Sequence, residues 1–142
     1  MKITAAPAGF NFGALRSDLE IVLGGTPLAR QGSAGEAALD IIRRAKLEPA
    51  PRAWDLLSIA LAVVTTDLAG HRAKSPDGWT RQFDLAVAVD DAPFWTTQGS
   101  SLQELLSFLS TDMWWLRFLD GGLLPAPPRK TVRPESDCVT LL

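Results

Sequence analysis

The sequence has little of the residues that build cross-linked or metal-bound sites. Its 142 residues include a single cysteine, Cys138, and a single histidine, His71. One cysteine cannot close an internal disulfide, and one Cys with one His is too few ligands for the usual zinc site. Charge of one sign is also scarce, because the formal net charge is only −2. We therefore expect no dedicated nucleic-acid surface, which normally needs a basic face, and a cytoplasmic protein.

Long apolar segments are missing as well. The first twelve residues contain Pro7 and Gly9 and lack the continuous apolar stretch of a signal peptide. The longest apolar run, residues 53–69, is interrupted by Asp55 and Asp67. Its uncharged part is shorter than the ~20 residues that span a bilayer. We therefore expect no membrane contact.

Residues 53–69 are instead the segment around which the fold is predicted to be built. Their apolar side chains recur at intervals of three and four residues, and further apolar groups occupy other faces. A helix of this kind is typically covered by other elements on several sides. Pro51 suits its first turn and Gly70 suits its C-terminal cap. The sequence predicts a central buried helix here.

Strand and helix patterns surround this segment. Apolar and polar side chains alternate over residues 79–89, which predicts a strand. A helix with Leu102, Leu105, Leu106 and Leu109 as its buried stripe follows. It begins either at Leu102 or, as one longer helix that tolerates Gly99, at Pro93. Residues 114–119 are predicted to form a return strand. Other predicted elements are strands at residues 2–5 and 19–23, and a helix that begins at the capping-box pattern of residues 33–36 with Ala37, Ala38, Ile41, Ile42 and Ala45 as its apolar stripe. The predicted class is α+β, a small and mostly antiparallel sheet covered by helices.

Four residues are candidates for binding a partner: Trp79, Arg81, Trp115 and Arg117. Arg81 lies on the apolar side of its strand. Either its stem covers apolar surface while its head reaches water, or it contacts an anion or a partner. Trp114 and Trp115 are neighbours in a strand and must face opposite ways, so we expect Trp115 to lie outside the core as a contact surface or a base-stacking platform.

Catalytic motifs are absent. Gly24-Gly25 follows a strand, but the spacing of a phosphate-binding fingerprint is missing, so a turn is predicted. Cys138 and His71 could form a nucleophile–base dyad, with Asp67 four residues before the histidine. A buried structural cysteine is the simpler interpretation. Asp90 and Asp91 precede Pro93 as helix-capping residues do. No catalytic, cofactor-binding or metal-binding residue is therefore assigned.

Three segments resemble one family. They are Val-Asp-Asp-Ala-Pro-Phe-Trp at residues 89–95, Phe-Leu-Ser-Thr-Asp-Met-Trp-Trp-Leu-Arg-Phe at 108–118, and Arg-Pro-Glu-Ser-Asp-Cys-Val-Thr-Leu-Leu at 133–142. They are similar to the N-terminal region of QueC-like proteins, relatives of 7-cyano-7-deazaguanine synthase in antiphage defence operons, particularly the QatC type. The resemblance covers roughly residues 50–142.

The resemblance implies a division of the chain and a role for it. Residues 1–122 would be an accessory domain, 123–136 a Pro/Arg-rich linker, and 137–142 the first strand of an interrupted ATP-binding α/β domain. ATP and zinc are implied only for a complete relative, because the pyrophosphate loop and the zinc cysteines would follow Leu142. The expected partner is another defence-operon protein or the ATP-binding domain. The alternatives are a stand-alone binding domain and a small enzyme that uses Cys138 and His71.

Overall fold

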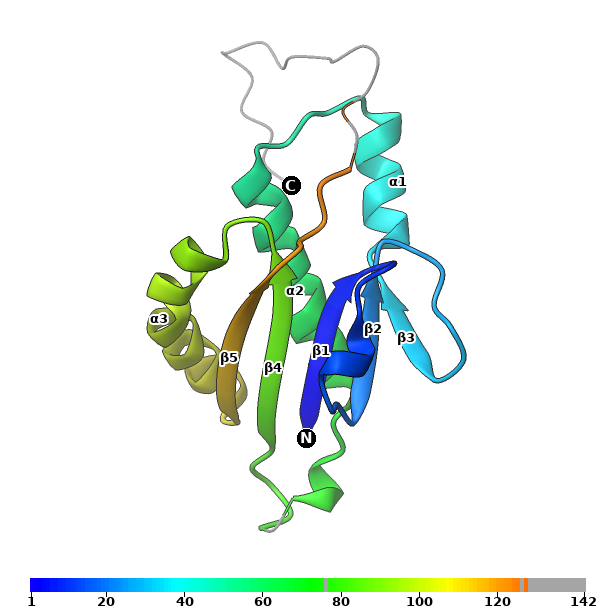
Figure 1. Ribbon diagram of the computed structural model, residues 1–142. Coiled ribbons are helices and arrows are strands. Elements are labelled where there is room, and N and C mark those ends of the chain that lie inside the picture. The colour runs from blue at the N-terminus through cyan, green and yellow to red at the C-terminus, as the bar shows by residue number, and fades with distance from the viewer. Residues whose placement is uncertain (76, 126, 128–142) are drawn as a thin grey trace.

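The computed structural model describes residues 1–75, 77–125 and 127, and within them five strands form one sheet (Figure 1). Three α-helices and two short 3-10 helices connect the strands. The strands are β1 (Lys2–Pro7), β2 (Leu19–Leu23), β3 (Gln31–Ala34), β4 (Gln82–Val89) and β5 (Met113–Asp120). The helices are η1 (Phe12–Ala14), α1 (Glu36–Arg44), α2 (Pro51–Ala69), η2 (Arg72–Lys74) and α3 (Ala92–Ser110).

The sheet has the strand order β3-β2-β1-β4-β5, and every neighbouring pair runs parallel. The predicted mixture of helices and sheet is confirmed. The predicted antiparallel pairing is wrong. Between β4 and β5 the chain runs through α3, whose 19 residues carry it back to the end of the sheet where β4 began. β5 therefore starts level with β4, and Gln82 pairs with Met113.

Both long helices pack on the same face of the sheet. One core cluster joins Ile59 and Ala62 of α2 to Trp95 of α3 through side chains of the strands. The strand residues in this cluster alternate as the sequence predicts, and include Ile3, Ile21, Phe83, Leu85, Val87, Val89 and Trp114. α2 contacts all of β1, β2, β3 and β4, so its predicted central place is confirmed. The prediction that other elements cover α2 on several sides is wrong for the part of the chain that the structure describes, because Leu56, Val64 and Leu68 on its outward side are 52, 57 and 76% exposed.

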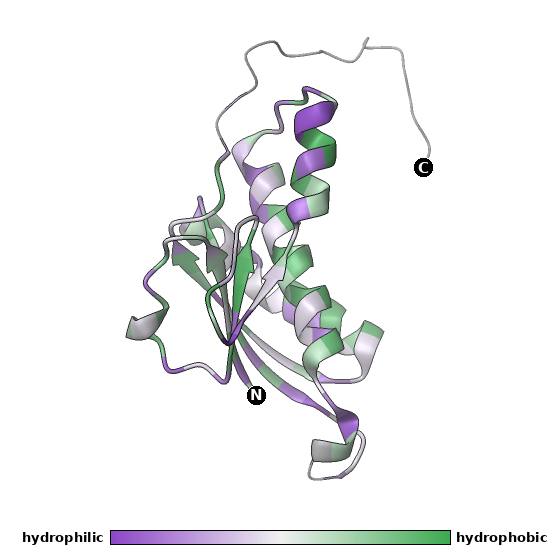
Figure 2. Ribbon diagram, turned by 90° about the vertical axis from the view of Figure 1, so that its right-hand side faces the viewer, coloured by the Kyte–Doolittle hydropathy of each residue, from purple (hydrophilic) through white to green (hydrophobic). Residues whose placement is uncertain are grey.

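The other face of the sheet has only partial cover. The connection between β1 and β2, which contains η1, crosses it on the side opposite α2 (Figures 1 and 2). Phe10 and Phe12 of this connection pack on Ala6, Val22 and Ala88. The cover lies over the carboxyl ends of β1, β2 and β4, and no described helix lies over the first half of β4 and β5.

The start of α1 differs from the predicted capping pattern, whereas the start of α3 agrees with it. Ser33 lies in strand β3, and α1 follows Gly35, whose φ of 92° needs glycine. The predicted apolar stripe of α1 is also wrong, because Leu39 is the buried residue and Ile41 is 67% exposed. α3 is one continuous helix, and its N-cap Asp91 accepts a hydrogen bond from Phe94 N at 3.1 Å.

The α3 stripe is shifted by part of a turn from the predicted one. Leu102 and Leu106 pack against the core, whereas Leu105 and Leu109 are exposed. No described helix is long and apolar enough to cross a membrane. The predicted strand at 137–142, with Cys138, and most of the predicted linker lie outside the described residues.

Candidate functional site

The candidate site is the uncovered face of β4 and β5, which we call the β4–β5 face. It consists of Gln82, Asp84, Met113, Trp115 and Arg117. These side chains share a face because residues two apart in a strand point the same way and because Gln82 pairs with Met113 and Asp84 with Trp115. The opposite set, which includes Phe83 and Trp114, is buried under the helices.

An aromatic side chain forms the centre of the β4–β5 face. Trp115 is 49% exposed and Met113 is 48% exposed. Trp114 points the other way, is 4% exposed, and its ring lies 4.5 Å from that of Phe83. The prediction that the two adjacent tryptophans separate, with Trp115 outside the core, is therefore confirmed.

Charged groups surround the tryptophan. The Nε and Nη2 atoms of Arg117 lie 3.1 and 3.0 Å from Oδ1 of Asp84, which sits on the neighbouring strand directly opposite Trp115. Lys2 of β1 pairs with Asp84 from the other side and is exposed. The result is an exposed ring and thioether beside one carboxylate and two cations. Such a set suits binding to another surface, and it lacks the paired acid and base that proton transfer needs.

Arg117 also reaches a groove at the edge of the sheet. This groove, about 320 Å³, lies between α3 and β5 and is lined by Thr96, Gly99 and residues 116–119. β5 is an edge strand among the described residues, so within that part of the chain one side of its backbone has no neighbouring strand. The amide Oε1 of Gln103 accepts a hydrogen bond from Leu116 N at 2.8 Å, which satisfies one of these edge groups.

Trp79 lies on the loop before β4 and is 65% exposed. The guanidinium of Arg72 lies 5.2 Å from its ring and donates a hydrogen bond to its carbonyl. Asp77 accepts hydrogen bonds from the backbone N–H groups of Trp79 and Thr80, which lower the pKa of Asp77 to about 2. The loop is thus held by its own contacts, and Trp79 is outside the β4–β5 face as we define it.

Arg81 is buried, and its head contacts anions, which are two carboxylates of its own chain. It is 8% exposed, so little of its guanidinium reaches water, unlike the first of the two predicted roles. It donates instead to the carboxylates of Asp112 and Asp67, both at 2.5 Å. The hydrogen bonds that Arg81 donates to Asp112 raise the pKa of Arg81 above its usual range despite burial. Its side chain is therefore engaged within its own chain.

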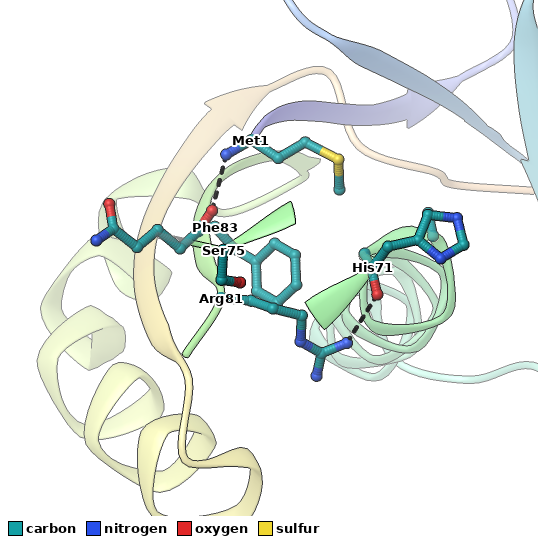
Figure 3. Close-up of a pocket in the computed structure, with 8 residues that line it drawn as sticks. Met1, His71, Ser75, Arg81 and Phe83 are labelled. Atoms are coloured by element: carbon teal, nitrogen blue, oxygen red, sulfur yellow. Dashed lines mark hydrogen bonds between the residues drawn. The ribbon is translucent and has the colours of Figure 1, made fainter. Parts of the chain in front are cut away.

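A pocket of about 270 Å³ lies beside Arg81, at the amino ends of β1 and β4 (Figure 3). Met1, His71 and Ser75 contribute to its lining. The small-enzyme alternative needs Asp67 to pair with His71. The Asp67 carboxylate is instead bound by Arg81. Cys138 lies outside the described residues, so the proposed dyad has no described geometry. Among the described residues no group of three His, Cys, Asp or Glu could hold a metal ion.

The carboxyl ends of the strands, where parallel sheets commonly bind ligands, are crossed by the chain itself. Gly122 N donates to Val89 O at 3.0 Å, and a Cβ on Gly122 would lie 2.3 Å from the Val89 backbone. Below this crossing Asp55, which is fully buried, accepts hydrogen bonds from the backbone N–H groups of Asp90 and Asp91 and from the indole of Trp95. These carboxylates organise the β4–α3 turn, and Asp91 caps α3 as predicted.

No protein-family model, no curated protein and no solved structure matches the chain. The resemblance to QueC-like proteins therefore stays a prediction.

Proposed function

We propose that this chain is a protein-docking domain and that the β4–β5 face binds its partner. The observation that carries the proposal is the uncovered face of a parallel sheet. Strands of parallel sheets are normally covered on both faces, whereas here no described helix covers the β4–β5 face, which lies on the side of the sheet opposite α2 and α3. A partner would supply the missing layer.

The residue types on the face support a protein as the partner. Tryptophan, methionine and arginine are enriched at the centres of protein interfaces, and buried tryptophans often dominate the binding free energy. Trp115 and Met113 would be the apolar centre. Arg117, Asp84 and Lys2 would form the polar rim, where charges set orientation and association rate more than affinity.

The family resemblance narrows the expected partner. If the chain is the accessory domain of a QueC-like defence protein, the β4–β5 face would bind either another protein of the same operon or an ATP-binding domain. The ATP-dependent deazapurine chemistry would then belong to that domain. None of it is assigned to residues 1–142.

Binding measurements on purified proteins test this proposal. Proteins encoded beside this chain, and a separately produced ATP-binding domain where one is encoded, would be titrated against it by calorimetry. We expect Trp115→Ala to weaken binding by about 30-fold or more, since truncation of a central tryptophan commonly costs ~2 kcal/mol or more. Leu28→Ala, on the loop between β2 and β3 and 75% exposed, is the control and should bind normally. Equal affinity of both variants would rule out the β4–β5 face as the binding surface.

A further inference from the structure

The outward side of α2 is unusual for a helix that covers a sheet. Beyond Arg52, the most exposed residues of α2 are apolar, namely Ala53, Leu56, Ala60, Val64 and Leu68. The one charged side chain that is also partly exposed there is Asp67, which Arg81 binds. A helix at the surface of a globular protein normally carries polar groups on this side. α2 is therefore built as if another layer covered it, and Figure 2 shows much green along it on the side of the sheet away from η1.

The spacing of these residues forms a regular ridge. Leu56, Ala60, Val64 and Leu68 follow one another at intervals of four, which is the row that packs into the grooves of a second helix. Ala60 lies near the middle of the row. A small side chain at that point lets two helix backbones approach closely.

α3 continues the apolar surface within the same helix layer. Leu105, Phe108 and Leu109 are 51, 84 and 69% exposed. Together with Leu56, Val64 and Leu68 they form what we call the helix-layer face. These six side chains leave on the order of 700 Å² of apolar surface in water, close to the ~800 Å² that each protein contributes to a standard interface.

We propose that the helix-layer face binds a second copy of this chain and forms a two-fold symmetric dimer in which the two α2 helices cross near Ala60. Two observations favour a second copy over a different protein. The ridge carries no charge, so it does not repel an identical ridge. The charges at its two ends are already paired within the chain, Arg52 with Asp91 and Asp67 with Arg81, so an identical partner does not have to supply counter-charges.

The mass of the full-length chain in solution, from sedimentation equilibrium and light scattering, tests the dimer. We expect a dimer for the wild type and a dissociation constant raised about 100-fold or more by Val64→Glu, because each copy then buries an unpaired carboxylate. Val64 is 57% exposed, so the variant should keep its fold, which circular dichroism checks. Leu28→Glu, at a 75% exposed position away from both helices, should remain dimeric. A monomeric wild type, or a Val64→Glu dimer as tight as the wild type, would overturn the proposal.

Cross-linking tests the crossing point itself. In a Cys138→Ser background, Ala60→Cys should form a disulfide-linked dimer quickly on mild oxidation, whereas Thr97→Cys, exposed on α3, should not. Equal rates for the two variants would contradict a crossing at Ala60. Trp115→Ala should leave the dimer unchanged, which separates this proposal from partner binding at the β4–β5 face.

Discussion

Arg81 and Asp112, the residues immediately before β4 and β5, form a buried ion pair that joins the starts of the two strands. Nε and Nη2 of Arg81 lie 3.0 and 2.5 Å from Oδ2 of Asp112, and the Arg81 backbone N–H donates to Oδ1 at 2.9 Å. The Arg81 guanidinium also donates to the carbonyls of Asp67 and Gly70, which end α2. One side chain thus connects β4, β5 and the end of α2.

Removing one member of this pair should destabilise the protein strongly. Asp112→Ala leaves the Arg81 guanidinium largely buried without its main partner, and such a loss typically lowers the free energy of unfolding by about 3–5 kcal/mol. Arg117→Ala breaks an exposed ion pair on the neighbouring face and should cost about 1 kcal/mol or less. Urea denaturation of the two variants measures both values. Similar losses would mean that the Arg81–Asp112 pair does not hold the strands together.

The same pair should make stability depend on pH in the acid range. Burial raises the pKa of Asp112, but hydrogen bonds from Arg81 outweigh it, and the folded pKa lies below the usual value. The stabilisation is therefore fully present above the unfolded pKa of about 4 and is lost as the pH falls through the folded value. The free-energy difference between wild type and Asp112→Asn should be constant near neutral pH and shrink below about pH 4. A difference that grows on acidification would contradict the lowered pKa.

Asp55 should be essential for the turn between β4 and α3. It is fully buried and accepts three hydrogen bonds, from Asp90 N, Asp91 N and the indole of Trp95. Asp55→Ala leaves these donors unpaired and should lower the free energy of unfolding by about 3 kcal/mol or more. Ser58→Ala is the matched control, because Ser58 is equally buried on the same helix and its hydroxyl has no partner among the described residues. Thermal unfolding should show a large loss for the first variant and none for the second.

Local patterns predicted the elements that depend on periodicity. The alternation in β4, the apolar run of α2 and the opposite directions of Trp114 and Trp115 all follow from residue spacing, and the structure agrees. The longer of the two predicted forms of α3 is also the observed one. These features are set by neighbours along the chain, which sequence reasoning can use directly.

Features that depend on distant contacts were missed. β3 has the sequence QGSA, which carries no apolar alternation, and it forms by pairing with β2. Parallel pairing of β4 and β5 follows from the helix between them, and the predicted order of strand, helix and strand is the sequence signal for it. The partner of Arg81 was also missed, because Asp112 lies 31 residues away and the turn before β5 brings it near. An arginine on the apolar side of a strand was the available signal that a buried carboxylate faces it.

Gly122 should hold the segment after β5 across the carboxyl ends of the strands. A Cβ at this position would lie 2.3 Å from Val89 C and 2.4 Å from Asp90 N, which are backbone atoms that cannot move aside easily. Gly122→Ala should therefore break the Gly122 N to Val89 O hydrogen bond and lift this segment from the sheet. Gly78→Ala is the control for backbone strain without a steric clash. Open space surrounds Gly78, so only its φ of 71° opposes a side chain there. Hydrogen exchange should show lost protection of the residue-122 amide in the first variant, while amides in the centre of the sheet stay protected. Unchanged protection of the residue-122 amide would contradict this role of Gly122. It would mean that leucine side chains hold the segment, above all Leu123, which lies near Gly24 at the end of β2.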